Sequence, residues 1–314
     1  MRVLLAGATG AIGRPLVGQL RAAGHTVVGL TRSDERAREL AATGAKAVVC
    51  DALDRERLLA LAAEVEPEAV IHQLTALPRR IDPRKAGPAL AATNRLRVEG
   101  TRNLADAAAA AGARKLVAQS VAFAYDVGDG RLRSEDAPLV RRPPGAMRAV
   151  VDALRALEQT TLEAPGLGGV VLRYGYFYGP GTFYARDGSI AEDVVRRRMP
   201  LVGGGGGVFS FIHTDDAAAA TVAALERGKP GVYNVVDDEP AAVRDWLPVY
   251  AELLRAPRPL KVPRLLARLL AGPYAVYMMC LQPGGSNAKA KAELGWSPKY
   301  PSWRDGFAAM LASP

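Results

Sequence analysis

The chain is predicted to fold as a doubly wound, parallel α/β sheet of the Rossmann-like kind, with a smaller C-terminal cap. Its first half alternates short Val/Ile/Leu runs with alanine-rich helical segments, which is typical of parallel strands covered by helices on both faces. Glycines follow the first apolar run directly, at Gly7, Gly10 and Gly13. After residue 172, Gly- and Pro-rich segments interrupt the alternation, which indicates a second, less regular part.

Six short apolar runs are predicted as the strands of this sheet. They are Val3–Leu5, Thr26–Leu30, Ala47–Val49, Ala69–Ile71, Lys115–Ala118 and Val170–Leu172. The helices predicted between them are Pro15–Ala23, Asp34–Ala42, Arg55–Glu64, Arg95–Ala111 and Ala149–Glu163. Each connection is long enough for a right-handed crossover, so the strands can lie side by side and parallel.

The composition limits the classes of partner. Of 314 residues, 49% are hydrophobic and 23% charged, with a formal net charge of +9. The basic residues are scattered without interleaved aromatics, so we expect no nucleic-acid partner. The longest apolar stretch, 265–281, is interrupted by an arginine and a Gly-Pro pair, so no membrane association is expected. No metal-ligand spacing occurs among the cysteines and histidines, and a cytoplasmic location is the prediction.

The glycine loop between the first strand and helix predicts a dinucleotide site. Glycines allow a tight turn and a close approach of the backbone to a pyrophosphate, and the helix N-terminus offers free N–H groups. The predicted contacts from this loop are Gly7, Thr9, Gly10, Ala11, Ile12 and Gly13. The alternative is a tight turn that binds no dinucleotide.

The end of the second strand favours NADP(H) over NAD(H). An acidic residue that would bind the ribose 2′-hydroxyl is absent there, and Arg32 stands in its place, where its guanidinium can pair with a 2′-phosphate. A surface arginine is the alternative. Asp51, followed by Ala52, is placed to accept a hydrogen bond from adenine, or to cap the next helix. Residues 1–172 are the predicted dinucleotide-binding domain, rejoined by 209–237, and 173–208 with 238–314 form the predicted substrate-binding cap.

Several ordered segments resemble the extended short-chain dehydrogenase/reductase family, which contains sugar-nucleotide epimerases and dehydratases. The resemblance spans nearly the whole chain. It implies a nicotinamide lined by Gln73, Leu74 and Thr75, with Ser120 nearby and Tyr174 in a stretch that lies over it. Relatives often dimerise through a four-helix contact, which the predicted helices Arg95–Ala111 and Ala149–Glu163 could form, so a homodimer is expected by analogy. The matching segments are 7–13, 51–54, 70–76, 99–104, 172–181, 211–217 and 293–298.

One motif of that family is missing. The family's Tyr-x-x-x-Lys moves a proton during hydride transfer, because the lysine lowers the tyrosine pKa. Aligning Glu158 with the family's glutamate puts Val150 and Leu154 at these two positions, and no Tyr-x-x-x-Lys occurs elsewhere in the chain. The chain therefore resembles an atypical branch.

Other side chains are candidates for the chemistry. Ser120, at the end of the fifth strand, and Tyr125, in the following loop, are predicted as hydrogen-bond or proton donors, with capping and packing roles as alternatives. A cluster of aromatic residues suggests a small, fairly apolar or aromatic substrate, or else packing of the cap. The predicted substrate contacts in this cluster are Tyr176, Phe177, Tyr178 and Phe183.

Three functions stay open on this evidence. The first is an NADP(H)-dependent oxidoreductase acting on a small molecule. The second is a redox-neutral enzyme, such as a lyase, cyclase or epimerase, that keeps the dinucleotide. The third is a dinucleotide-binding sensor without catalysis.

Overall fold

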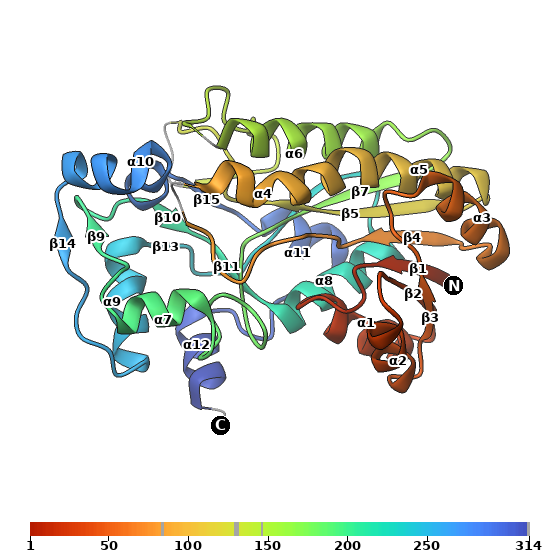
Figure 1. Ribbon diagram of the computed structural model, residues 1–314, viewed down its shortest axis with the longest axis horizontal. Helices are drawn as coiled ribbons and strands as arrows, with labels where there is room; N and C mark the ends of the chain where they lie inside the picture. The colour runs from red at the N-terminus through yellow and green to blue at the C-terminus, as the bar shows by residue number, and fades with distance from the viewer. Residues whose placement is uncertain (83–84, 129–131, 146, 313–314) are drawn as a thin grey trace.

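A computed structural model describes residues 1–82, 85–128, 132–145 and 147–312 of the chain. Its centre is a seven-stranded parallel sheet with the strand order β12-β7-β5-β4-β1-β2-β3 (Figure 1). The doubly wound fold predicted from the sequence is confirmed. The strands are β1 (Arg2–Ala6), β2 (Thr26–Thr31), β3 (Lys46–Val49), β4 (Ala69–His72), β5 (Lys115–Val121), β7 (Gly168–Tyr174) and β12 (Gly231–Val235).

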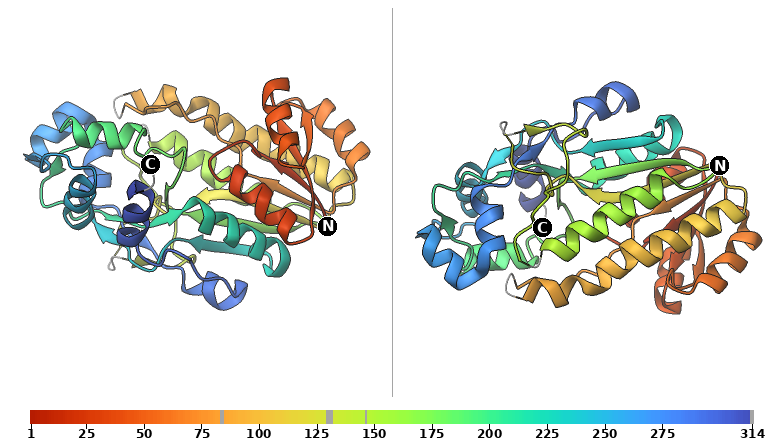
Figure 2. Two further views of the ribbon diagram at one scale, coloured as in Figure 1. Left: turned by 90° about the horizontal axis from the view of Figure 1, so that it is seen from below. Right: turned by 90° about the horizontal axis from the view of Figure 1, so that it is seen from above.

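Helices cover both faces of this sheet (Figure 2). One face is covered by α1 (Gly13–Ala22), α2 (Asp34–Ala42) and α8 (Thr214–Arg227), and α11 (Ala288–Leu294) packs beside α8. The other face is covered by α3 (Arg55–Val65), α5 (Thr101–Ala110) and α6 (Met147–Leu162).

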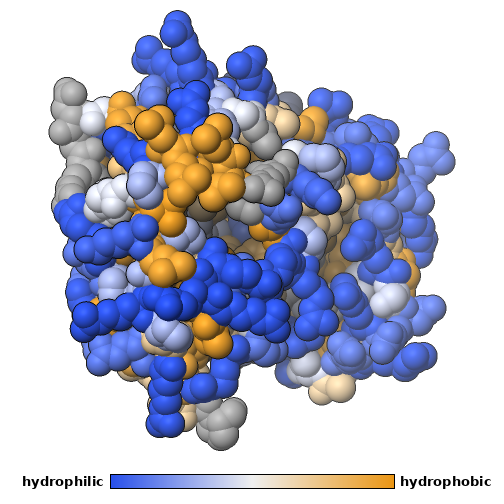
Figure 3. Space-filling model, turned by 60° about the vertical axis from the view of Figure 1, so that its left-hand side comes forward, coloured by the Kyte–Doolittle hydropathy of each residue, from blue (hydrophilic) through white to orange (hydrophobic). Residues whose placement is uncertain are grey.

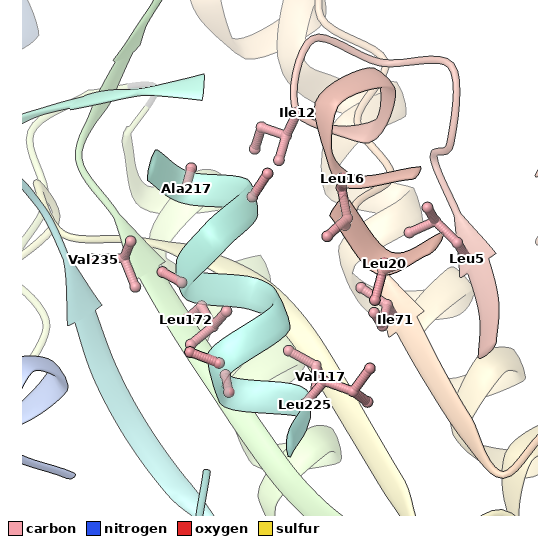
Figure 4. Packing of buried hydrophobic residues seen from close by; sticks show 14 of the residues in the cluster. Leu5, Ile12, Leu16, Leu20, Ile71, Val117, Leu172, Ala217, Leu225 and Val235 are labelled. Atoms are coloured by element: carbon pink, nitrogen blue, oxygen red, sulfur yellow. The ribbon is translucent and has the colours of Figure 1, made fainter. Parts of the chain in front are cut away.

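The alternation of side chains along the strands divides the core into two layers. In β1, Val3 and Leu5 join the cluster under α1 and α8, whereas Leu4 and Ala6 join the cluster under α3 and α5. Figure 4 shows the first layer, where Leu16 and Leu20 of α1 approach the sheet next to α8. Both faces of each central strand are therefore apolar, which explains the continuous Val/Ile/Leu runs in the sequence.

The helix predicted at Arg95–Ala111 is longer and interrupted. It begins as α4 (Ala86–Arg95), widens into a five-residue π-helix, η2 (Leu96–Gly100), and continues as α5. All three parts pack against α6. A π-helical turn inserts an extra residue and redirects nearby side chains, and such turns are frequent at functional sites.

The cap lies beyond the carboxyl ends of the strands. Its helices are α7 (Ser189–Val195), α9 (Val243–Leu253), α10 (Arg264–Cys280) and α12 (Trp303–Ala312). Short strand pairs accompany them: β6 (Leu132–Arg133) with β15 (Gly284–Gly285), β8 (Tyr176–Tyr178) with β11 (Phe211–His213), β9 (Leu201–Val202) with β14 (Lys261–Val262), and β10 (Val208–Phe209) with β13 (Ala241–Ala242).

The cap has its own core, rich in aromatic rings, built around Trp246, Phe211 and Phe307. Its outer side is partly apolar: Leu265 and Leu269 of α10 are 80% and 83% exposed, and Figure 3 shows apolar side chains gathered on this side of the molecule. Among the described residues no helix is long and apolar enough to cross a membrane.

Candidate active site

The glycine loop has the geometry of a phosphate-binding turn. Gly7 has φ +95°, and a Cβ built there would lie 2.6 Å from the Gln73 carbonyl oxygen; a Cβ on Gly13 would lie 2.1 Å from the Gly7 carbonyl oxygen. The Gly10 amide donates to that same Gly7 oxygen at 3.1 Å. Because α1 begins at Gly13, the positive end of its dipole faces the end of the loop, while the Arg14 amide donates to the Gly10 carbonyl oxygen at 3.1 Å. The residues present therefore fit a bound pyrophosphate.

The other predicted adenosine-side residues lie along the same edge of the sheet. Arg32 is exposed just after β2, and no acidic partner for it occurs in the described part of the chain. Asp51 is exposed and accepts a 3.0 Å hydrogen bond from the Leu53 amide, a local turn that leaves its other oxygen available. Ala52 is buried, and its carbonyl oxygen accepts from Asn103 at 2.9 Å.

Next to the glycine loop, the end of β4 presents a different set of groups. Gln73 is buried and donates to the Tyr174 hydroxyl at 3.0 Å, and that hydroxyl also lies 2.6 Å from Thr221 Oγ1. The Tyr174 ring is fully buried, so it supports Gln73 from the core side, although it was predicted to contact the dinucleotide. Leu74 and Thr75 are half-buried beyond the strand end.

The helix that would hold the proton-transfer pair is apolar at both positions. Val150 is half-buried and Leu154 fully buried, and both pack in a cluster with Val121 and Met147. Neither side chain can donate or accept a proton. The structure thus places hydrocarbon where the resemblance predicts a tyrosine and a lysine.

The two candidate proton donors instead join a buried polar network. Ser120 Oγ donates to Glu158 Oε1 at 2.6 Å, and Arg173 binds both oxygens of Glu158 at 2.8 and 2.6 Å. Arg173 also donates to the Tyr125 hydroxyl at 3.0 Å. Ser120 and Tyr125 are both fully buried, so this geometry favours structural roles over the catalytic roles predicted for them.

This network fastens the sheet to the cap. The Tyr125 hydroxyl donates to Asn234 Oδ1 at 2.6 Å, and the Asn234 amide nitrogen reaches the Ser286 carbonyl at 3.0 Å. Tyr277, on α10, donates to the Tyr125 carbonyl at 2.8 Å. Burial raises the pKa of Tyr125, which keeps its proton on the phenol.

The predicted aromatic substrate contacts differ in accessibility. Tyr178 is fully buried in the cap core, and Phe183 is half-buried against it. Phe177 is half-buried on the sheet side. The Tyr176 ring stacks on two other rings, with centroid separations of 4.2 Å to Phe123 and 4.3 Å to Phe209, so both of its faces are covered. Packing of the cap accounts for most of this cluster.

Three residues near Val150 were not singled out by the sequence. Phe123 and Tyr274 are half-buried and pack in the same cluster as Val150, and Arg97 of η2 interacts electrostatically with Tyr274. We call Phe123, Val150 and Tyr274 the apolar patch. Only the family's proton-transfer alignment could have drawn attention to this region, since an isolated arginine in a helix has no distinguishing pattern.

Residues 3–235 match the family model described as the NAD dependent epimerase/dehydratase family. The chain belongs to this family. It is 50% identical, over 98% of this chain and 99% of the relative, to a protein of a Streptomyces species named 3-diazoavenalumate denitrifying reductase. It is 28% identical to a 4-hydroxy-2-methyl-3-oxo-4-farnesyl-3,4-dihydroquinoline-1-oxide ketoreductase of Stigmatella aurantiaca, over 80% of this chain and 73% of that one.

A solved relative supports the same assignment. The UDP-glucose 4-epimerase of Thermus thermophilus, in complex with NAD, superimposes with a TM-score of 0.75 and 26% identity, covering 99% of this chain and 98% of that one. The chain is therefore an enzyme of the NAD(P)-dependent oxidoreductase and epimerase type, in a family that binds nicotinamide dinucleotides. Among the described residues, no group of three His, Cys, Asp or Glu side chains is arranged to hold a metal ion.

Proposed function

We propose that this chain is an NADPH-dependent reductase that removes the diazo group of a small aromatic carboxylate as dinitrogen. The observation that supports this most directly is the pairing of Val150 and Leu154 at the proton-transfer positions with 50% identity to a denitrifying reductase. The name of that relative describes reductive loss of nitrogen from a diazo-substituted carboxylate.

The chemistry explains why an apolar site suffices. A bound NADPH supplies a hydride. An aryl diazonium that gains a hydride already contains every atom of its products: ArN₂⁺ and H⁻ together make ArH and N₂, as the C–N bond breaks and the nitrogen leaves. A ketone that gains a hydride becomes an alkoxide and still needs a proton, the task of a Tyr-x-x-x-Lys pair. Diazonium reduction needs no such donor.

The protein's own groups have simpler tasks in this proposal. The loop from Gly7 to Gly13 holds the pyrophosphate, and Arg32 binds the 2′-phosphate that distinguishes NADPH from NADH. The apolar patch contacts the aromatic ring and excludes water, with which an aryl diazonium would otherwise react. The network of Glu158 and Arg173 keeps the sheet and cap in register around this patch.

The test uses purified protein, NADPH and an ortho-hydroxy aryl diazonium bearing a carboxylate and a nitrogen-isotope label in its diazo group. We expect one labelled N₂ released for each NADPH oxidised, measured by mass spectrometry and by loss of the reduced-nicotinamide absorbance. NADH should serve less well. Release of N₂ without NADPH consumption, or turnover of UDP-glucose in place of the diazo compound, would contradict the proposal and favour a redox-neutral enzyme.

A further inference from the structure

Arg97 is a charged side chain in a helical segment that packs against α6. It lies in the π-helical turn η2, between α4 and α5, on the side that packs against α6. Its side chain is half-buried, unlike that of its neighbour Arg95, which is exposed and pairs with Glu99 at 2.8 Å. The turn therefore directs one arginine outward and the next one inward.

The half-buried guanidinium of Arg97 has no counterion among the described residues. Its one hydrogen bond to a side chain is from Nη1 to Asn94 Oδ1 at 3.2 Å, and no carboxylate lies within ion-pair distance among the residues that the structure describes. This half-buried guanidinium has five donors and a single neutral side-chain acceptor, so it can take an anion. By contrast, Arg173, which is buried, is matched by both oxygens of Glu158.

Two further neutral groups, Tyr274 and His72, interact electrostatically with Arg97. Burial lowers the pKa of Arg97 to about 10, and the nearby phenol of Tyr274 is the group that opposes this. Burial likewise lowers the pKa of His72 to about 4, so that its imidazole is neutral beside Arg97. Burial raises the pKa of Tyr274 to about 12, so its hydroxyl keeps its proton. In the described part of the chain this hydroxyl has no hydrogen-bond partner.

The Arg97 guanidinium and the Tyr274 phenol, neither of which has an anionic partner among the described residues, thus lie together at the edge of the apolar patch. This is a suitable arrangement for a flat apolar molecule that ends in an anion: the ring contacts the patch, and the anion accepts from the two donors. A carboxylate matches a guanidinium in two parallel hydrogen bonds.

We propose that Arg97, assisted by the Tyr274 hydroxyl, binds the carboxylate of an aromatic acid substrate and selects it over neutral analogues. This inference rests on the proposed function for the identity of the reacting group, but its anion-binding part can be tested separately. In that role Arg97 is a specificity-determining residue, and it takes no part in the chemical step.

The binding test uses 4-hydroxycinnamate, which carries no diazo group, and its neutral amide as probes, with the NADP⁺-loaded protein in a calorimetric titration. We expect Arg97→Gln to weaken binding of the acid about 10- to 100-fold and to change binding of the amide less than about threefold. Arg97→Lys should recover part of the loss, and Tyr274→Phe should weaken the acid by about two- to tenfold. Arg95→Gln, close by in the same helix and exposed, is the matched control and should bind as the natural chain does.

The kinetic test compares a diazo acid with its descarboxy analogue. We expect Arg97→Gln to raise KM for the acid with little change in kcat, and to leave the analogue unaffected. If Arg97→Gln weakens the acid and the neutral probes equally, or weakens neither, the carboxylate role of Arg97 is overturned. This holds even if the natural chain reduces both diazo compounds. A natural chain that reduces neither diazo compound but shows selective, Arg97-dependent binding of 4-hydroxycinnamate would refute the diazo reaction alone and support the anion site.

Discussion

The glycine loop and helix α6 relate to the family in opposite ways. The loop keeps the backbone geometry that a pyrophosphate needs, with Gly7 and Gly13 at positions no side chain can occupy. Helix α6 keeps its place on the sheet but presents Val150 and Leu154 in the positions of a proton-transfer pair. We therefore propose that holding a dinucleotide and donating a proton are separable in this fold.

The difference follows from what each region uses. The loop acts through main-chain amides and the helix terminus, so its function depends on where the backbone lies. The proton-transfer pair acts through two side-chain functional groups, which two substitutions remove while the helix still packs. A reaction that needs a hydride but no proton is compatible with losing the second and keeping the first.

Breaking the loop should have the largest effect. In Gly13→Val the new side chain collides with the loop, because a Cβ on residue 13 would lie 2.1 Å from the Gly7 carbonyl oxygen. We expect the affinity for the dinucleotide, measured by calorimetric titration, to fall about 100-fold or more. Gly18→Ala is the control in the same helix, because a Cβ there meets nothing within 4 Å. It should bind normally and unfold at a slightly higher temperature. Normal binding by Gly13→Val would show that the loop does not hold the pyrophosphate.

The buried network beside α6 should be the next most sensitive feature. Arg173→Met leaves the Glu158 carboxylate buried without its partner, and we expect a loss of about 3–5 kcal/mol in the free energy of unfolding, measured with urea. The double variant Arg173→Met, Glu158→Leu removes both charges and should be less destabilised than Arg173→Met alone. A double variant that is as unstable as the sum of the two single variants would mean that the pair is not coupled.

Substitution of Arg32, on the adenosine side of the predicted dinucleotide site, should have a smaller effect on binding, and one that is selective for NADPH. Because Arg32 is exposed and without an acidic partner in the described chain, Arg32→Ala should weaken NADPH about 10- to 100-fold and NADH less than about threefold, in direct binding titrations. Arg36→Ala, in the following helix, is a control that should change neither. Equal weakening of both dinucleotides would show that Arg32 does not read the 2′-phosphate.

The smallest of these four expected effects is a pH-dependent change in the free energy of unfolding on substitution of Asp237. Both carboxylate oxygens of Asp237 are buried without a cationic partner among the described residues, and burial raises its pKa well above the ordinary value although the backbone amides of Glu239 and Trp303 oppose this. The folded chain then binds the proton of Asp237 more tightly than the unfolded chain does. The destabilisation of the folded chain by Asp237 is therefore absent below about pH 4 and grows as the pH rises. Asp237→Asn should increase the free energy of unfolding by about 1 kcal/mol or more at about pH 8, and by less at about pH 5.

That comparison is made by chemical denaturation of both chains in matched buffers. It sharpens the contrast with Glu158, which is also a buried carboxylate but has Ser120 and Arg173 as partners. An advantage of Asp237→Asn that is constant with pH would mean that Asp237 does not titrate differently in the folded chain.

Much of the scaffold could be predicted from the sequence. The six strands in 1–172 were predicted within a few residues, because strands buried on both faces read as uninterrupted apolar runs. The glycine loop was predictable because its function depends on residues that lack a Cβ. The π-helical turn was not, since Leu96–Gly100 reads as ordinary helix and the extra residue is visible only in backbone hydrogen bonding.

The site was predictable only in part, because burial decides whether a functional group is available. Ser120, Tyr125, Tyr174 and Tyr178 have reactive-looking hydroxyls in the sequence, yet all four are fully buried in the structure. Hydroxyls look the same in a sequence whether they face a substrate or an internal partner such as Glu158.

The sequence by itself determined the strand pattern, the glycine turn after the first strand and the absence of a Tyr-x-x-x-Lys motif, because each depends on residue types at short spacing. Only the tertiary structure decided which polar groups are satisfied. It paired Glu158 with Arg173 from separate elements and left Arg97, beside Tyr274, without an anion among the described residues. Such pairing depends on distances between segments far apart in the chain, which periodicity and spacing do not encode.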